Sequence, residues 1–92
     1  MKDKMSIEIN KRFFEALEYV RSTGKIRGIG TFCREYDLNR IKYIGVRQQI
    51  NNPNPPEYIT YKNIDVSALG FLCRDYGISA EWLLLGEGGM LK

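Results

Sequence analysis

The sequence contains no histidine, only two cysteines, and three prolines that all lie between residues 53 and 56. Without histidine, a histidine general base, a serine–histidine triad and a histidine–cysteine zinc site are excluded. The carboxylates are scattered and no pair of nucleophile and base can be identified, so we expect no enzyme. Cys33 and Cys73 lie beside aromatic or aliphatic residues, a setting that favours buried hydrophobic cysteines over a disulfide framework. No cofactor or metal is expected.

Long hydrophobic runs are also missing. No apolar stretch approaches the roughly 20 residues that a bilayer-spanning helix needs, and the first residues lack the apolar core of a secretory signal. We therefore expect a cytoplasmic protein without a membrane partner. The 92 residues, 43% of them hydrophobic, suffice for one core. Residues 1–92 are predicted to form a single domain whose first few residues are flexible.

The net charge of +3 is unevenly distributed along the chain. Residues 21–49 carry seven cations and two carboxylates, residues 1–20 are neutral, and residues 50–92 carry a net charge of −2. A basic segment attracts a polyphosphate backbone, because each phosphate contact releases condensed counterions. A solvated cationic surface without a partner would have the same composition, so charge alone leaves both interpretations open.

Apolar residues recur at helical spacing in five segments, and no segment has a convincing strand pattern. Asn39, Asp65 and Ser79 are predicted N-caps. The proline-containing segment 51–60 is predicted to be a loop between helices, held on the core by Tyr58, Ile59 and Tyr61. The predicted helices lie near residues 8–22, 29–36, 40–50 and 66–76, with a last short helix after Ser79. We therefore predict an all-α protein.

One pattern occurs twice, because FCREYDLN at residues 32–39 returns forty positions later as LCRDYGIS at residues 72–79. Each copy combines the end of a helix, a tight turn and an N-cap that opens another helix. The helix after the second copy is short and apolar, whereas the helix after the first has an apolar stripe and a long polar face. Only the first copy offers a surface able to read DNA, so a helix-turn-helix is predicted over residues 29–50.

Two stretches resemble the phage-repressor-like, or lambda-repressor-like, branch of the helix-turn-helix superfamily. One is residues 29–50, and the other is YGISAEWLLLGEG at residues 76–88, which is similar to the YGxSxxWLLxGxG close of many phage-type repressor N-terminal domains. The resemblance covers most of the chain from about Phe13 onward. It implies a five-helix DNA-binding domain, a homodimer on operator-like double-stranded DNA, and a role as a transcriptional repressor or similar regulator.

Several residues depart from the family's pattern. Asp37 stands where the turn usually carries glycine, and aspartate adopts the left-handed conformation less easily. Gly45 lies inside the proposed reading helix, while Ile41 and Ile44 occupy positions where polar readers are often found. Base readout would then depend on fewer polar residues or on thymine methyls. Since the chain stops at Lys92, we expect no C-terminal dimerisation and self-cleavage domain.

The candidate DNA-binding residues lie on or beside the two helices of the motif. Arg40 is the first choice for a base contact, with a phosphate contact or a solvated arginine as alternatives. Asn39 can act as both a cap and a phosphate contact, and Arg27 and Thr31 can meet the DNA backbone at the start of the first helix, or simply cap it and be solvated. The complete set is Arg27, Thr31, Asn39, Arg40, Ile41, Lys42, Ile44, Arg47 and Gln48.

A second candidate surface comprises Trp82 and Leu85, which form either part of the core or a surface for a dimer or another partner. It supports an alternative function, a helical protein–protein interaction module that keeps the fold without reading DNA. A fold by itself does not establish function. This alternative is favoured by the residues in the proposed reading helix that are not polar readers, namely Ile41, Ile44 and Gly45.

Overall fold

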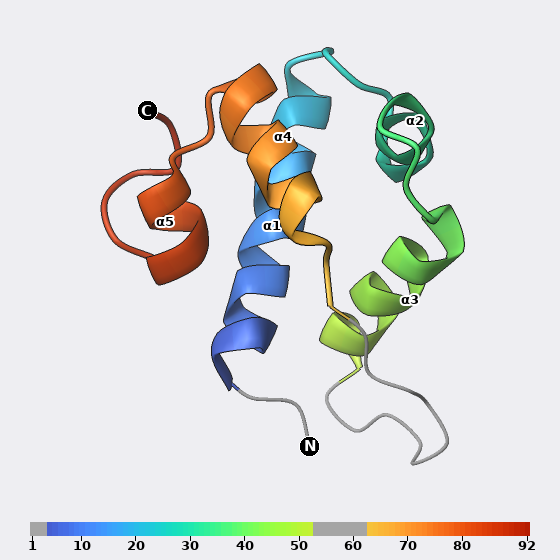
Figure 1. Ribbon diagram of the computed structural model, residues 1–92, viewed down its shortest axis with the longest axis horizontal. Coiled ribbons are helices and arrows are strands. Elements are labelled where there is room, and N and C mark those ends of the chain that lie inside the picture. The colour runs from blue at the N-terminus through green and yellow to red at the C-terminus, as the bar shows by residue number, and fades with distance from the viewer. Residues whose placement is uncertain (1–3, 53–62) are drawn as a thin grey trace.

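The computed structural model describes residues 4–52 and 63–92, and within these ranges the chain forms five α-helices and no strand (Figure 1). The all-α class is therefore confirmed. No helix in this part of the chain has both the length and the apolar character needed to cross a bilayer. The predictions for the first few residues and for Tyr58, Ile59 and Tyr61 lie outside the described residues. The helices are α1 (Lys4–Ser22), α2 (Ile29–Glu35), α3 (Arg40–Asn51), α4 (Val66–Tyr76) and α5 (Ala80–Leu85).

Helix α1 begins at Lys4, earlier than the predicted start near residue 8. No glycine or proline interrupts this segment, and Glu8 and Lys11 form an ion pair one turn apart. Asn10 is buried on α1, where its side-chain Oδ1 accepts from the backbone N–H of Ile64 at 3.3 Å. The early part of α1 therefore supports the segment that leads into α4.

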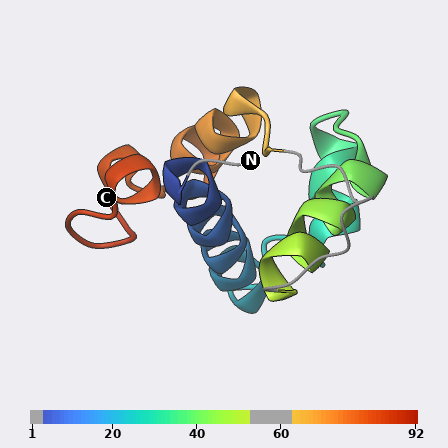
Figure 2. The same ribbon diagram turned by 90° about the horizontal axis from the view of Figure 1, so that it is seen from below.

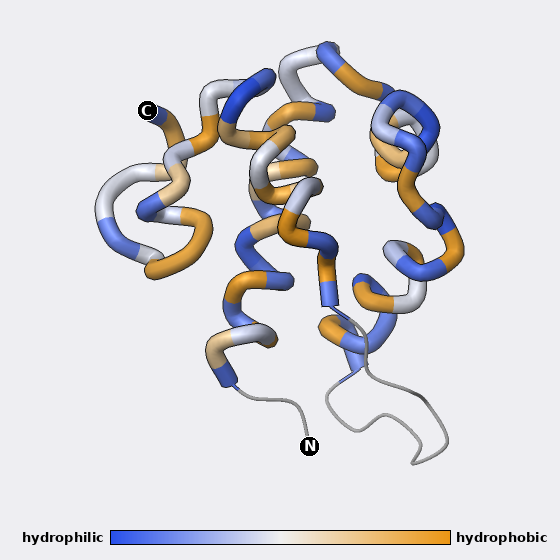
Figure 3. The backbone as a smooth tube through the Cα atoms, viewed as in Figure 1, coloured by the Kyte–Doolittle hydropathy of each residue, from blue (hydrophilic) through white to orange (hydrophobic). Residues whose placement is uncertain are grey.

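Helix α1 runs through the middle of the molecule, with α2 and α3 on one side and α5 on the other (Figures 1 and 2). It packs against α3, α4 and α5, while α2 packs against α3. Hydrophilic and hydrophobic residues alternate along α3, whereas α5 ends in a hydrophobic run (Figure 3). This difference agrees with the predicted polar face on α3 and apolar character of α5.

The core contains an aromatic cluster that joins three helices. Phe13 of α1 makes edge-to-face contacts with Phe32 of α2 and Tyr43 of α3, with ring centroids 5.8 Å apart in both pairs. All three side chains are fully buried. Cys33 is buried and Cys73 half-buried, and neither is in a disulfide, which confirms their prediction as core cysteines rather than as a disulfide framework.

The two copies of the repeated pattern have the same local geometry. Asp37 has a φ of 55° and Gly77 a φ of 71°, so both turns pass through the left-handed region. Asn39 accepts a hydrogen bond from the backbone N–H of Lys42, and Ser79 accepts from that of Trp82. The predicted N-caps at Asn39 and Ser79 are thereby confirmed.

The two copies also contact each other. The Tyr36 hydroxyl donates to Asp75 Oδ2 at 2.7 Å, and the Tyr36 ring stacks on that of Phe71, the residue just before the second copy, with centroids 4.2 Å apart. Hydrogen bonds from the Arg74 guanidinium and, to a lesser extent, from the Tyr36 hydroxyl lower the pKa of Asp75 to about 2. The contact ties the turn before α3 to α4.

Replacing Asp37 with valine should lower the free energy of unfolding by about 1–2 kcal/mol, because a β-branched residue resists the left-handed conformation. Asp37 is exposed, so the loss reflects backbone strain and not lost packing. Asp37→Gly is the control and should change the stability by less than about 1 kcal/mol, since relief of strain offsets the added entropy of the unfolded chain. Urea denaturation measures both, and equal stabilities for the valine and glycine variants would contradict the prediction.

Candidate nucleic-acid interface

Helix α3 has a core face and an outward face. Tyr43 and Val46 are fully buried, while Ile41 is 82% exposed and Gln48 is exposed. Residues three, four and seven apart share one side of a helix, so Ile41, Gly45 and Gln48 form a row opposite the core. We call these three residues the outward row.

Gly45 lies in the middle of the outward row. A Cβ atom at this position would meet no described atom within 4 Å, so packing within the described chain does not require a glycine there. Glycine inside a helix costs about 1 kcal/mol relative to alanine. The missing side chain exposes the backbone between Ile41 and Gln48, which gives an external molecule room to approach closely.

Arg40 and Arg47 flank the outward row on the side towards α2, and both are exposed. The Arg40 side chain lies over Gly30 of α2, where a Cβ would be 3.6 Å from Arg40 Nε. Neither arginine has an ion pair within residues 4–52 and 63–92. Ile44, between them on this side, is half-buried. This edge of α3 therefore presents two cations that form no ion pair among the described residues.

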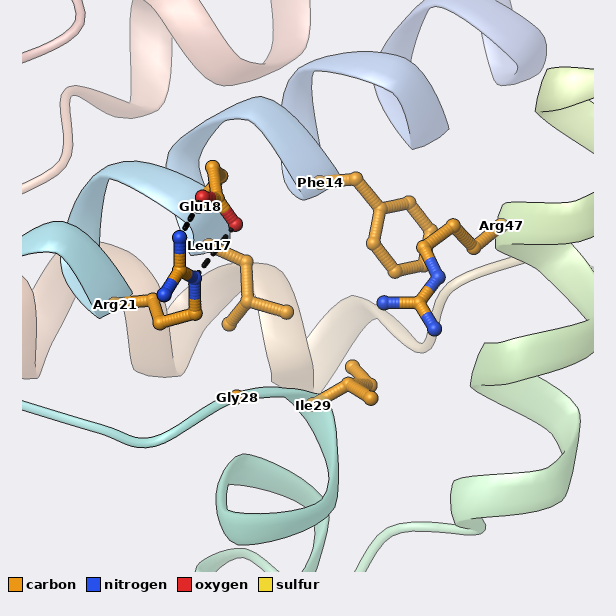
Figure 4. Close-up of a pocket in the computed structure, with 7 residues that line it drawn as sticks. All are labelled: Phe14, Leu17, Glu18, Arg21, Gly28, Ile29 and Arg47. Carbon is orange, nitrogen blue, oxygen red and sulfur yellow. Dashed lines mark hydrogen bonds and ion pairs between the residues drawn. The ribbon is translucent and has the colours of Figure 1, made fainter.

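Arg47 also lines a hollow of about 90 Å³ where α1, the start of α2 and α3 meet (Figure 4). Across from it, Arg21 donates to both carboxylate oxygens of Glu18, with Nε to Oε2 at 2.9 Å, and this hydrogen bonding lowers the pKa of Glu18. Ligand pockets usually measure about 300–1,000 Å³, so this hollow is too small to be one. The lining residues are Phe14, Leu17, Glu18, Arg21, Gly28, Ile29 and Arg47.

The opposite edge of α3 carries a network centred on Asp65. Lys42 Nζ donates to Asp65 Oδ1 at 2.8 Å, and the Tyr43 hydroxyl donates to Asp65 Oδ2 at 2.6 Å. The backbone N–H of Asp65 in turn donates to Tyr43 Oη at 3.2 Å. Asp65 stands at the N-cap position of α4, but its side chain makes no capping hydrogen bond. The predicted N-cap position of Asp65 is thus confirmed, but its side chain does not cap α4, because Lys42 and Tyr43 engage both carboxylate oxygens.

The Asp65 network changes the pKa values of its members. Hydrogen bonds from Lys42 and Tyr43 hold the pKa of Asp65 below its ordinary value of 3.8. Burial, followed by the hydrogen bond to Asp65, raises the pKa of Tyr43. Around neutral pH the Asp65 carboxylate is thus ionised and the Tyr43 phenol is neutral. These are the protonation states in which the Tyr43 hydroxyl can donate its hydrogen bond to Asp65 Oδ2.

Replacing Asp65 with asparagine should reduce stability at neutral pH, and the difference from the unchanged protein should shrink as the pH falls below about 4. The folded-state pKa of Asp65 is depressed, so its contribution is complete above the unfolded-state pKa and is lost as the pH falls through the folded-state pKa. Urea denaturation between pH 2 and pH 7 tests this. A difference that stays constant with pH would show that ionised Asp65 contributes no stability.

The remaining predicted DNA-binding residues lie around α2 and the turn. Arg27 is exposed one residue before Gly28, the N-cap of α2, which provides no side-chain cap. Thr31 is half-buried on α2. Asn39 is exposed and its side-chain oxygen caps α3 through Lys42 N–H. The structure thus brings Arg40, Ile41, Ile44, Arg47 and Gln48 onto the solvent-facing part of α3, whereas the Lys42 ammonium is bonded to Asp65.

At the far side of α1, Trp82 is half-buried and packs against the core, while Leu85 is 58% exposed. Arg12 of α1 donates from Nε to the carbonyl oxygen of Leu83 at 2.9 Å and from Nη2 to that of Leu84 at 3.1 Å. These bonds satisfy carbonyl groups at the C-terminal end of α5. Local sequence patterns give no sign of this role of Arg12, because Arg12 and Leu83 are 71 positions apart.

The described residues thus define an all-α protein with an exposed, partly basic helix that follows a tight turn. Comparisons with protein-family models, curated proteins and solved structures gave no match to the chain. The functional argument therefore depends on the geometry of α3 and its neighbours.

Proposed function

We propose that this chain is a sequence-specific, double-stranded DNA-binding transcriptional regulator of the lambda-repressor-like helix-turn-helix type, acting in the cytoplasm as a repressor. The observation that carries the proposal is the two-sided character of α3. Its buried Tyr43 fixes the helix on the core, while Arg40, Ile41 and Gln48 face solvent on a helix that opens directly after a tight turn. Such a helix fits the major groove of B-DNA with its outward side chains against base edges.

The exposed side chains suit distinct contacts with DNA. Arg40, at the first turn of α3, can donate two hydrogen bonds to guanine, and Gln48 can pair with adenine in the same bidentate way. Ile41 and Ile44 offer methyl groups that pack against thymine methyls. Arg47, at the edge beside the hollow, can contact a phosphate. A homodimer completes the proposal, with the exposed Leu85 surface of α5 as its candidate contact.

Selection from a random duplex pool, followed by fluorescence anisotropy at two salt concentrations, tests the proposal. A dimer with two α3 helices should enrich a palindromic site, and its affinity should fall steeply with salt because cations replace counterions on the phosphates. Failure to bind any duplex at low salt would reject the proposal.

Arg40→Ala and Arg47→Ala should have different consequences for DNA binding. Loss of the Arg40 base contact should cost about 1–3 kcal/mol on the selected site and relax the preference at one base pair. Loss of the Arg47 phosphate contact should weaken binding to all sequences alike and make the logarithmic salt slope shallower by about 0.9. Anisotropy titrations on selected and scrambled duplexes distinguish these roles, and equal losses that do not depend on salt would refute the assignment.

A protein–protein interaction module is the second candidate function, because Leu84 and Leu85 are 42% and 58% exposed on α5. The two functions are separated by competing the selected site with scrambled duplex and by a pull-down with a Trp82→Ala variant. Loss of a captured protein together with absence of duplex binding would favour the interaction module.

A further inference from the structure

The two edges of α3 differ in their available charge. Arg40 and Arg47, on the edge towards α2, form no ion pair within the described part of the chain. Lys42, on the edge towards α4, is ion-paired with Asp65. A helix in the major groove has a phosphate backbone along each of its edges, so both edges would face phosphates. Only one of them presents cations that are not held in an ion pair with another described residue.

The carboxylate that engages Lys42 is held in place by more than the lysine. The Tyr43 hydroxyl, on a fully buried ring, donates to Asp65 Oδ2 at 2.6 Å and accepts from the Asp65 backbone N–H at 3.2 Å. Asp65 directly precedes α4. The position of the carboxylate therefore does not depend on Lys42 alone. The Lys42 side chain is 25% exposed, so it is more enclosed than a surface lysine that contacts only water.

We propose that Asp65 withholds Lys42 from DNA phosphates and thereby lowers the affinity for non-specific duplex. The inference rests on the proposed function, and it makes Asp65 a positioning residue that determines specificity without touching DNA. Non-specific binding consists almost entirely of phosphate contacts, whereas the outward row of α3 reads bases. Neutralising one edge cation therefore weakens non-specific binding and leaves base reading unchanged.

Four forms of the full chain test this proposal: the unchanged protein, Asp65→Asn, Lys42→Met and the double variant. Binding to a random-sequence duplex is measured by anisotropy between 50 and 200 mM salt. Asp65→Asn keeps an oxygen that accepts from Tyr43 but releases Lys42, so the logarithmic salt slope should steepen by about 0.9. The gain in affinity should then be about 3.5-fold larger at the lower salt concentration. Lys42→Met and the double variant should retain the slope of the unchanged protein.

Glu15→Gln is the matched control for net charge, since Glu15 is exposed on α1 and lies on neither α3 nor α5. It removes the same charge and should leave the slope unchanged. A purely structural role for Asp65 would weaken binding at every salt concentration, and the second substitution at Lys42 would not restore the slope. Thermal melts establish that each variant is folded at the assay temperature.

The outcomes separate this inference from the function on which it rests. If the unchanged protein binds duplex but Asp65→Asn has the same salt slope, or if Lys42→Met makes the slope shallower by about 0.9, the withholding role of Asp65 is overturned. If the unchanged protein binds no duplex at low salt, the proposed function fails and this inference fails with it.

Discussion

Ile41→Asp should lower affinity for the selected duplex by about 100-fold or more, while the fold is retained. Ile41 is 82% exposed at the second position of α3, so the substitution removes no core packing. An aspartate there also interacts favourably with the N-terminal end of the helix dipole. In the proposed complex, however, it places a carboxylate in the groove between two phosphate backbones, and like charges in an interface cost several kcal/mol.

Met5→Asp provides the matched control for this substitution. Met5 is also an exposed apolar residue at the second position of its helix, with 62% of its surface accessible. The variant carries the same change in net charge, but it lies on α1 and should retain most of the affinity. Anisotropy and thermal melts measure both variants. Equal losses of binding for the two would show that net charge, and not the position of Ile41 on α3, governs the interaction with DNA.

Phe13→Ala should lower the free energy of unfolding by about 3–5 kcal/mol, the usual cost of truncating a buried phenylalanine. Phe13 is fully buried and contacts Phe32 of α2 and Tyr43 of α3, so its removal leaves a cavity where three helices meet. Domains of this size are stable by about 5–15 kcal/mol, which makes the loss a large share of the total.

Phe14→Ala is the neighbouring control for the aromatic cluster. Phe14 is half-buried and lines the hollow beside Arg47, so solvent can occupy the vacated space and the cost should be clearly smaller. Urea denaturation followed by circular dichroism gives both values. If Phe14→Ala is as destabilising as Phe13→Ala, the joint between α1, α2 and α3 does not depend on the Phe13 ring.

Local patterns predicted most of the helices. Helices α2 and α3 differ by one residue from their predicted ends, and α4 has the predicted bounds. Short-range signals set the limits of three helices: Asn39 caps the start of α3, the left-handed Gly77 ends α4, and Ser79 caps the start of α5. The start of α1 was placed too late, because its first turns are held by Asn10 and the distant Ile64, and such a contact leaves no mark on local periodicity.

The outward row of α3 could be predicted for the same reason, since the spacing between Tyr43 and Val46 determines which side of the helix faces the core. The partner of Lys42 could not be predicted. Asp65 lies 23 positions away, beyond the proline-containing segment. Its position directly before a helix indicates an ordinary N-cap and not a partner for a distant lysine. The sequence therefore indicates which cations lie near the proposed site, but not that Lys42 is the one paired with a carboxylate.

Helix α1 connects the α3 surface and the α5 surface of the molecule rigidly. It is nineteen residues long, about 28 Å at the usual rise per residue, and it contacts α3 on one flank and α5 on the other. Arg12 clamps α5 to it through two carbonyl groups, and Phe13, the next residue, joins it to α2 and α3. Because Arg12 and Phe13 are adjacent in the chain, the contacts of α1 with α5 and with α2 and α3 start from neighbouring positions on the same helix. In the proposed homodimer, two copies joined through α5 would therefore hold their α3 helices at a nearly fixed separation, and this distance would determine the spacing of the half-sites on the proposed DNA site.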